Sequence, residues 1–205
     1  MAEISTQYPV NMTVDYPDRE LNRLTTFFRI FTIIPIAVVL GLLLWGINEE
    51  EGWRFLGAFV VIPTVLMILF QKKYPRWWFD WNVALARFCG RVTVYLALLR
   101  DEYPSTDEEQ AVHIDIKYPD VKEELSPVMP LFKWLLALPH YIVLLFITIA
   151  AVVVVIIAWF VILFTGRYPR SLFDFEVGVL RWYVRVYAYA FLMTTDRYPL
   201  FSLSN

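Results

Sequence analysis

Two patterns of apolar and polar residues follow each other along the chain, and the whole succession occurs twice. Residues 10–16 and 112–118 alternate apolar and polar side chains and end in Tyr-Pro, which predicts two short β-strands. Because a lone strand is not stable, we expect these two to pair outside the bilayer; the alternative is a pair of extended linkers. A long apolar stretch and a helix with spaced arginines follow each strand. The pattern predicts two tandem repeats, residues 1–104 and 112–205, joined by an acidic linker at 105–111.

The apolar stretch of the first repeat covers about residues 25–70 and is interrupted once, by an acidic turn. A helix rises 1.5 Å per residue and must cross a hydrocarbon core of about 30 Å, so two apolar runs of this length predict a membrane hairpin. Basic residues stand at both ends of the stretch, from Arg19 to Arg29 and from Lys72 to Arg76. The positive-inside rule therefore predicts that both ends face the cytoplasm.

The corresponding stretch of the second repeat, about residues 128–164, has no acidic turn and is shorter. Two geometries are open. A compact hairpin that bends near Thr148 is favoured, because basic residues again stand at both ends. The alternative is an interfacial helix up to Pro139, followed by one long tilted span from His140 to Phe164.

A helix with a narrow polar stripe follows each apolar stretch, over about residues 76–100 and 170–195. Each helix begins after a Tyr-Pro-Arg junction, where proline is tolerated. At 100° per residue the polar positions of each helix fall on one face. The stripe consists of Asp80, Arg87, Arg91 and Tyr95 in the first repeat and of Asp174, Arg181, Arg185 and Tyr189 in the second. The junctions are Tyr74, Pro75 and Arg76 in the first repeat and Tyr168, Pro169 and Arg170 in the second.

Three interpretations of the stripe compete. In the favoured one, each helix lies in the cytoplasmic interface and its arginines bind lipid phosphates. In the second, the helices are packed inside the protein and acids and arginines form ion pairs within it, since the guanidinium fork suits carboxylate as well as phosphate. In the third, the helices span the membrane and the arginines line an ion path.

Composition assigns the chain to a class. Hydrophobic residues make up 59% of it and charged residues 19%, which favours a mainly α membrane protein over a soluble domain. A net charge of -2 argues against nucleic acid as a partner. The polar, partly acidic N-terminal stretch does not resemble a cleavable signal peptide.

One family resemblance is carried by the second repeat. The residues are Tyr168-Pro169-Arg170, Phe173-Asp174-Phe175 and the closing Asp196-Arg197-Tyr198-Pro199-Leu200-Phe201. This repeat, from about Leu138 to Leu203, resembles the bacterial membrane family known as domain of unknown function 4389, and the first repeat resembles it more weakly. The resemblance implies an inner-membrane protein, often with duplicated units, and brings no catalytic residue.

The sequence contains no motif typical of a catalytic, metal-binding or phosphate-binding site. His113 and His140 are far apart and lack a metal-ligating partner at helical spacing, and no phosphate loop, nucleophile elbow or Cys-His pair occurs. We therefore expect no catalytic residue, no metal site and no cofactor.

The expected function is that of a non-enzymatic structural or interaction module, multi-pass in the inner membrane, with a cytoplasmic N-terminus. Its expected partners are anionic membrane lipids, another membrane protein or a second copy. The alternative is a small transporter or channel with a polar path between the repeats.

Overall fold

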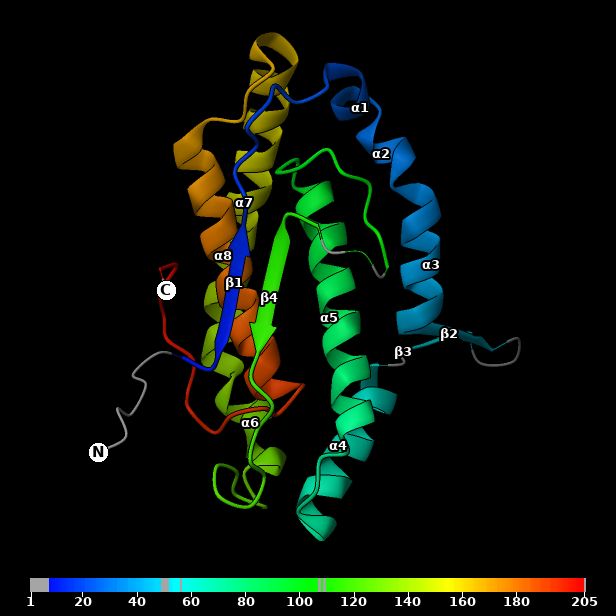
Figure 1. Ribbon diagram of the computed structural model, residues 1–205, viewed down its shortest axis with the longest axis vertical. Helices are drawn as coiled ribbons and strands as arrows, with labels where there is room; N and C mark the ends of the chain where they lie inside the picture. The colour runs from blue at the N-terminus through cyan, green and yellow to red at the C-terminus, as the bar shows by residue number, and fades with distance from the viewer. Residues whose placement is uncertain (1–7, 49–51, 56, 107, 109, 205) are drawn as a thin grey trace.

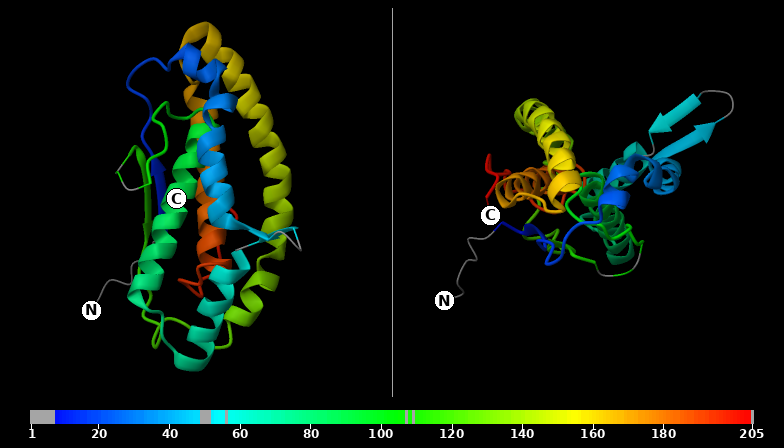
Figure 2. Two further views of the ribbon diagram at one scale, coloured as in Figure 1. Left: turned by 90° about the vertical axis from the view of Figure 1, so that its right-hand side faces the viewer. Right: turned by 90° about the horizontal axis from the view of Figure 1, so that it is seen from above.

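The chain folds into three layers that share one long axis (Figures 1 and 2). A computed structural model describes residues 8–48, 52–55, 57–106, 108 and 110–204, the side chains of residues 42–60 excepted. Two antiparallel helices, α5 and α8, form the middle layer; a two-stranded ribbon covers one side of it, and α7 lies on the other. The elements are β1 (Val10–Val14), α1 (Arg23–Phe27), α2 (Arg29–Thr32), α3 (Ile34–Leu44), β2 (Trp45–Asn48), β3 (Gly52–Phe55), α4 (Gly57–Gln71), α5 (Arg76–Leu96), β4 (Val112–Ile116), α6 (Pro130–Leu136), α7 (Leu138–Thr165) and α8 (Arg170–Ala190).

The two predicted strands form and pair with each other, as expected from their alternation. β1 and β4 are antiparallel, and Met12 lies opposite Ile114 at the centre of the ladder. The apolar side chains of the ribbon are buried against the middle layer, whereas His113 and Asp115 on its outer face are exposed. The period-two pattern thus predicted both the strands and the face that each one buries.

The favoured hairpin of the second repeat is wrong. Residues Leu138–Thr165 form one helix, α7, preceded by the short α6 and ended by Gly166, whose φ of 74° is in the left-handed region that glycine adopts freely. No glycine or proline occurs between His140 and Thr165, and Thr148 bonds the carbonyl of Leu144 within the helix. The stretch therefore contains no residue that would break it.

The expected hairpin of the first repeat also takes a different form. The apolar stretch begins with α1 and α2, and α3 and α4 then follow one another along the long axis instead of lying side by side (Figure 1; Figure 2, left). A β-hairpin of β2 and β3 projects between α3 and α4, with Asn48 paired to Gly52. The acidic residues 49–51 of the predicted turn lie outside the described residues. The β-hairpin thus interrupts two helices that run in the same direction. We call α3 and α4 together the α3–α4 column.

The two stripe helices end earlier than expected, at Leu96 and Ala190 instead of about 100 and 195. Shortly after each end, a residue other than glycine adopts a left-handed backbone conformation, with φ of 63° at Leu98 and 57° at Met193. Both side chains are buried in the main apolar core, which holds the turns in place. The chain then returns along the polar side of the molecule.

Candidate functional site

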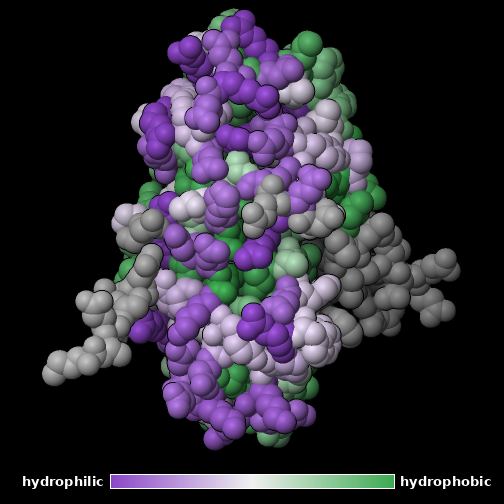
Figure 3. Space-filling view, in the orientation of Figure 1, coloured by the Kyte–Doolittle hydropathy of each residue, from purple (hydrophilic) through white to green (hydrophobic). Residues whose placement is uncertain are grey.

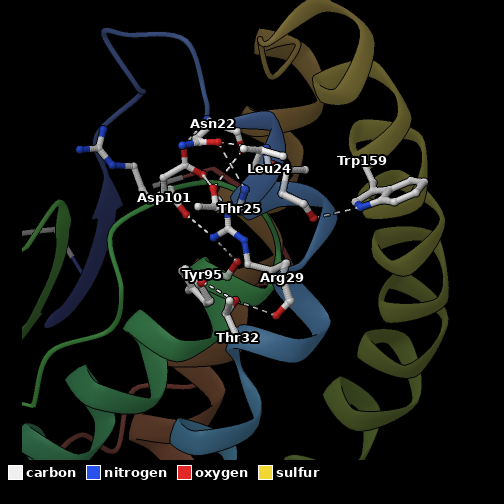
Figure 4. Close-up of polar contacts among 10 residues, drawn as sticks. Asn22, Leu24, Thr25, Arg29, Thr32, Tyr95, Asp101 and Trp159 are labelled. Carbon is white, nitrogen blue, oxygen red and sulfur yellow. Dashed lines mark hydrogen bonds and ion pairs between the residues drawn. The ribbon is translucent and has the colours of Figure 1, made fainter.

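A buried ion pair joins the start of the first apolar stretch to the end of α5 (Figure 4). Arg29 is 2% exposed, and its Nη2 lies 2.5 Å from Oδ1 of Asp101. Its Nη1 donates to the carbonyls of Tyr95 and Arg100, at 3.1 and 2.7 Å. The other carboxylate oxygen of Asp101 accepts the backbone N–H of Asn22 at 2.6 Å, so the acid fixes a helix start as well as the arginine.

The second half has the same arrangement around lysine. Lys133 is fully buried in α6, and its Nζ lies 2.8 Å from Oδ1 of Asp196 and 2.8 Å from the carbonyl of Thr195. Asp196 Oδ2 accepts the backbone N–H of Ser126 at 2.6 Å. Burial lowers the pKa of Lys133, and the hydrogen bond and charge of Asp196 oppose this shift. Each pair satisfies a buried cation that would otherwise be costly.

The stripe tyrosines complete these two pairs. The Arg29 guanidinium lies 4.0 Å from the ring centre of Tyr95, and Lys133 Nζ lies 5.4 Å from that of Tyr189. Both distances allow cation–π attraction. The two tyrosines of the stripe therefore serve buried cations inside the protein.

The first arginine of each stripe binds the strand of the other half. Arg87 Nε donates to the carbonyl of Ile114 in β4, and Arg181 Nε donates to that of Met12 in β1, both at 3.0 Å. These carbonyls belong to the two residues that face each other at the centre of the ribbon. The halves thus exchange strands: β1 lies on α8 and β4 lies on α5 (Figure 1).

The second arginine of each stripe binds the segment that returns after its own helix. Arg91 Nη1 donates to the carbonyl of Ser105, and Arg185 Nη2 donates to that of Ser204, both at 2.5 Å. Arg181 Nη1 also donates to the carbonyl of Leu203, at 3.1 Å. All four stripe arginines consequently have carbonyl partners within the chain, including the exposed Arg87.

The stripe acids do not pair with the stripe arginines. Asp80 and Asp174 are exposed and pair with Arg76 and Arg170 one turn earlier, at 3.2 and 3.1 Å. Exposed pairs of this kind contribute little to stability. The structure therefore divides the predicted stripe into exposed acids and arginines that clamp backbone.

The Tyr-Pro junctions form two matched interlocks across the halves. The hydroxyl of Tyr16 donates to the carbonyl of Tyr168, and the hydroxyl of Tyr118 donates to that of Tyr74. The junction arginines cover the same rings, with Arg170 4.7 Å from the ring centre of Tyr16 and Arg76 4.8 Å from that of Tyr118. The proline that follows each of Tyr74 and Tyr168 precedes the first residue of a stripe helix, as expected.

Two kinds of residue at this site were not predicted from the sequence. Asp101 and Asp196 stand among other polar residues after the stripe helices, so no pattern marked them as partners of buried cations. Glu176 in α8 is 3% exposed, and no hydrogen-bond partner of its Oε1 is found in the described part of the chain. Burial raises its pKa to about 7. The signal in the sequence was an acidic residue at a position of α8 where the helical period predicts an apolar one.

His140 is a packing residue in this structure. It is fully buried; its Nδ1 accepts from the indole N–H of Trp182 at 3.0 Å, and its ring stacks on Phe201 with centroids 3.9 Å apart. Within residues 8–48, 52–55, 57–106, 108 and 110–204, no three His, Cys, Asp or Glu side chains are grouped as a metal site would require.

Comparison with known proteins gives a partial match. A family model described as a domain of unknown function (DUF4389) matches residues 129–202, in the second half of the chain, and does not match the first half. No curated protein and no solved structure matches the chain. The matched residues include Lys133, Asp196 and all four stripe residues of α8.

Proposed function

We propose that this protein is a non-enzymatic module of the bacterial inner membrane, built from two copies of one unit, that lies flat on the cytoplasmic leaflet and binds anionic lipid. The observation that carries the proposal is α7. Among the described helices, it is the one long and apolar enough to cross a membrane, with a mean hydropathy of 3.2. Five of its 28 residues are buried, so most of its apolar surface needs lipid.

The polar ribbon argues for a flat orientation over an upright one. The hydroxyls of Thr148 in α7 and Tyr183 in α8 are hydrogen-bonded, and Arg181, half a turn before Tyr183, bonds Met12 at the centre of the ribbon. The ribbon is therefore level with the middle of α7. If α7 stood upright, the exposed His113 and Asp115 would lie near the bilayer centre, where an aspartate costs about 3 kcal/mol.

The distribution of charge supports the same orientation. Exposed basic residues lie at both ends of the long axis, such as Arg167 at the end of α7 and Lys73 at the end of α4. The positive-inside rule assigns both ends to the cytoplasm, and a continuous α7 can satisfy that only by lying along the membrane. Figure 3 shows hydrophilic residues over most of the ribbon side. That side would face the cytoplasm, with α7 and the α3–α4 column in lipid.

The matched contacts support the duplication. The two buried cation–acid pairs, the two strand clamps and the two tyrosine interlocks join residues that correspond in the two halves of the sequence. An antiparallel ladder centred on the corresponding residues Met12 and Ile114 has local twofold symmetry. A duplicated unit whose copies exchange strands accounts for all of these contacts together.

Sided cysteine labelling tests the orientation. The sole native cysteine, Cys89, is first replaced by serine. Single cysteines then replace the exposed Lys73, Arg167 and His113, and a membrane-impermeant maleimide is applied to right-side-out and inverted vesicles. We expect all three positions to label in inverted vesicles only, because a flat molecule keeps both ends and the ribbon on the cytoplasmic side.

An upright molecule gives a different pattern. Its two ends would label from opposite sides, and His113→Cys would label slowly or from within a water-filled path, which is the result expected of a transporter. Ile149→Cys, on the exposed apolar face of α7, is the control and should stay unlabelled in both preparations.

A further inference from the structure

The junction between α4 and α5 borders an open surface hollow of about 600 Å³ whose lining is strongly basic. Five cations line it, against two acids, Asp120 and Glu124. The cations are Lys72, Lys73, Arg76, Lys117 and Lys122. The volume is in the range of small-molecule sites and larger than one phosphate needs.

The five cations differ in whether an acid pairs with them. Lys117 pairs with Glu124 at 2.8 Å, and Arg76 pairs with Asp80. For the ammonium groups of Lys72, Lys73 and Lys122, no ion pair is found with any described residue. Because these three lysines line one hollow, they raise its positive potential, which favours an anion there.

The corresponding junction of the other half is an internal comparison. Its backbone interlock is the same, but its charged groups balance, with three acids and three arginines. These are Asp15, Asp18, Glu20, Arg19, Arg167 and Arg170. Arg167 there has an acidic neighbour, Glu20, at 3.6 Å. The excess of positive charge is therefore not required by the interlock.

The backbone conformation of Lys72 also indicates that the positive charge of the hollow is not required by the interlock. Lys72 has a φ of 47°, in the left-handed region, and the corresponding residue of the other half is Gly166 with a φ of 74°. Glycine adopts this conformation without strain and lysine does not. A lysine held there places a cation at the hollow against its own backbone preference.

The apolar surface beside the hollow suits a lipid. Ile62, Leu66 and Phe70 are exposed at intervals of four residues along α4, so they form one stripe that ends two residues before Lys72. Trp77, 70% exposed, stands on the other side of the junction, where an indole favours the membrane interface. Acyl chains along this stripe would bring their headgroup to the three lysines.

We propose that this hollow binds the phosphates of a multiply charged anionic lipid headgroup, such as the two phosphates of cardiolipin. The proposal rests on the proposed membrane function and places the headgroup site at the lysines, whereas the stripe arginines are occupied by carbonyls.

Native mass spectrometry of the full chain in mild detergent, titrated with cardiolipin, tests the site. The test variant is Lys72→Gln, Lys73→Gln and Lys122→Gln together; the control, Arg19→Gln, Arg23→Gln and Arg167→Gln together, removes the same charge at the opposite end. Three lysines near a lipid surface together contribute a factor on the order of 100 in affinity, so we expect the test variant to bind cardiolipin about 100-fold more weakly. The control should stay within about twofold, which is within ordinary variation for distant surface changes.

Further arms separate the remaining explanations. Replacing the same three lysines by arginine should retain binding, because the charge is kept. Equal losses in the test and control variants would overturn the site in favour of diffuse electrostatic attraction. Displacement of cardiolipin by pyrophosphate at similar affinity would overturn the lipid assignment in favour of a soluble phosphate. The maleimide experiment reports which side of the membrane each position faces and does not measure lipid affinity, so the orientation and this site can fail separately.

Discussion

At the scale of single residues, the corresponding positions Asn82 and Glu176 show how one buried site holds different groups. Both are buried in the middle layer, and the amide of Asn82 donates to the carbonyl of Trp78 at 2.7 Å. A neutral amide suits this site, whereas a carboxylate suits it only when protonated. Glu176 consequently makes the stability of the fold depend on pH.

We predict that Glu176→Gln removes a loss of stability between pH 5 and pH 8. The native carboxyl holds its proton up to a pKa of about 7, whereas the unfolded one loses it near 4.5. The folded state thus binds more protons in this window, so the free energy of unfolding falls as pH rises, by about 3 kcal/mol in all. Thermal unfolding of the full chain in detergent at both pH values measures the difference.

The matched control for this prediction is Asn82→Asp, which introduces a carboxylate at the corresponding site. It should create a new loss of stability at pH 8. If the wild type and Glu176→Gln show the same pH dependence, Glu176 is already ionised in the fold.

At the scale of elements, the buried cation–acid pairs connect the start of each apolar stretch to the segment after each stripe helix. Arg29 and Asp101 join α2 to the segment after α5, and Lys133 and Asp196 join α6 to the segment after α8. Because each cation is buried, its acid is needed to keep the adjoining elements in contact.

We predict that Asp101→Asn and Asp196→Asn each lower the free energy of unfolding by about 3 kcal/mol, because each leaves a buried cation without its countercharge. Denaturant titration in detergent measures the loss. The control is Asp174→Asn, which removes an exposed acid paired with Arg170 and should cost less than about 1 kcal/mol. Similar losses in all three variants would show that the buried pairs contribute no more to stability than the exposed pair.

At the scale of the whole molecule, the strand exchange makes each half depend on the other. β1 is held by Arg181 and packs on α8, and β4 is held by Arg87 and packs on α5. The acidic linker, residues 105–111, connects the halves covalently, and the exchanged strands connect them as well.

We predict that a protease site inserted after Thr106 can be cut without separating the halves. The nicked protein should elute as one species in mild detergent and separate only when unfolded, since the exchanged strands and the tyrosine interlocks remain. Size-exclusion chromatography followed by denaturing electrophoresis measures this. Halves that elute apart after cutting would contradict the exchanged arrangement.

Several features were determined by the sequence alone. Alternation predicted β1 and β4 and their pairing, and the narrow polar stripes predicted α5 and α8 and their proline starts, because these signals depend on neighbouring residues. Composition and the two long apolar stretches indicated contact with a membrane. The same local signals could not fix the form of the apolar stretches, since a long apolar run is compatible with a bent hairpin or with one straight helix.

Only the tertiary structure decided what the polar groups of the stripe bind. Arg181 and its carbonyl partner at Met12 are 169 positions apart, and Arg87 and its carbonyl partner at Ile114 are 27 apart. No period or spacing in the sequence encodes such pairs. The residue type alone does not specify the acceptor, because an arginine can bind a phosphate, a carboxylate or a carbonyl. The strand exchange determines the partner, because it brings the backbone of one half under the side chains of the other.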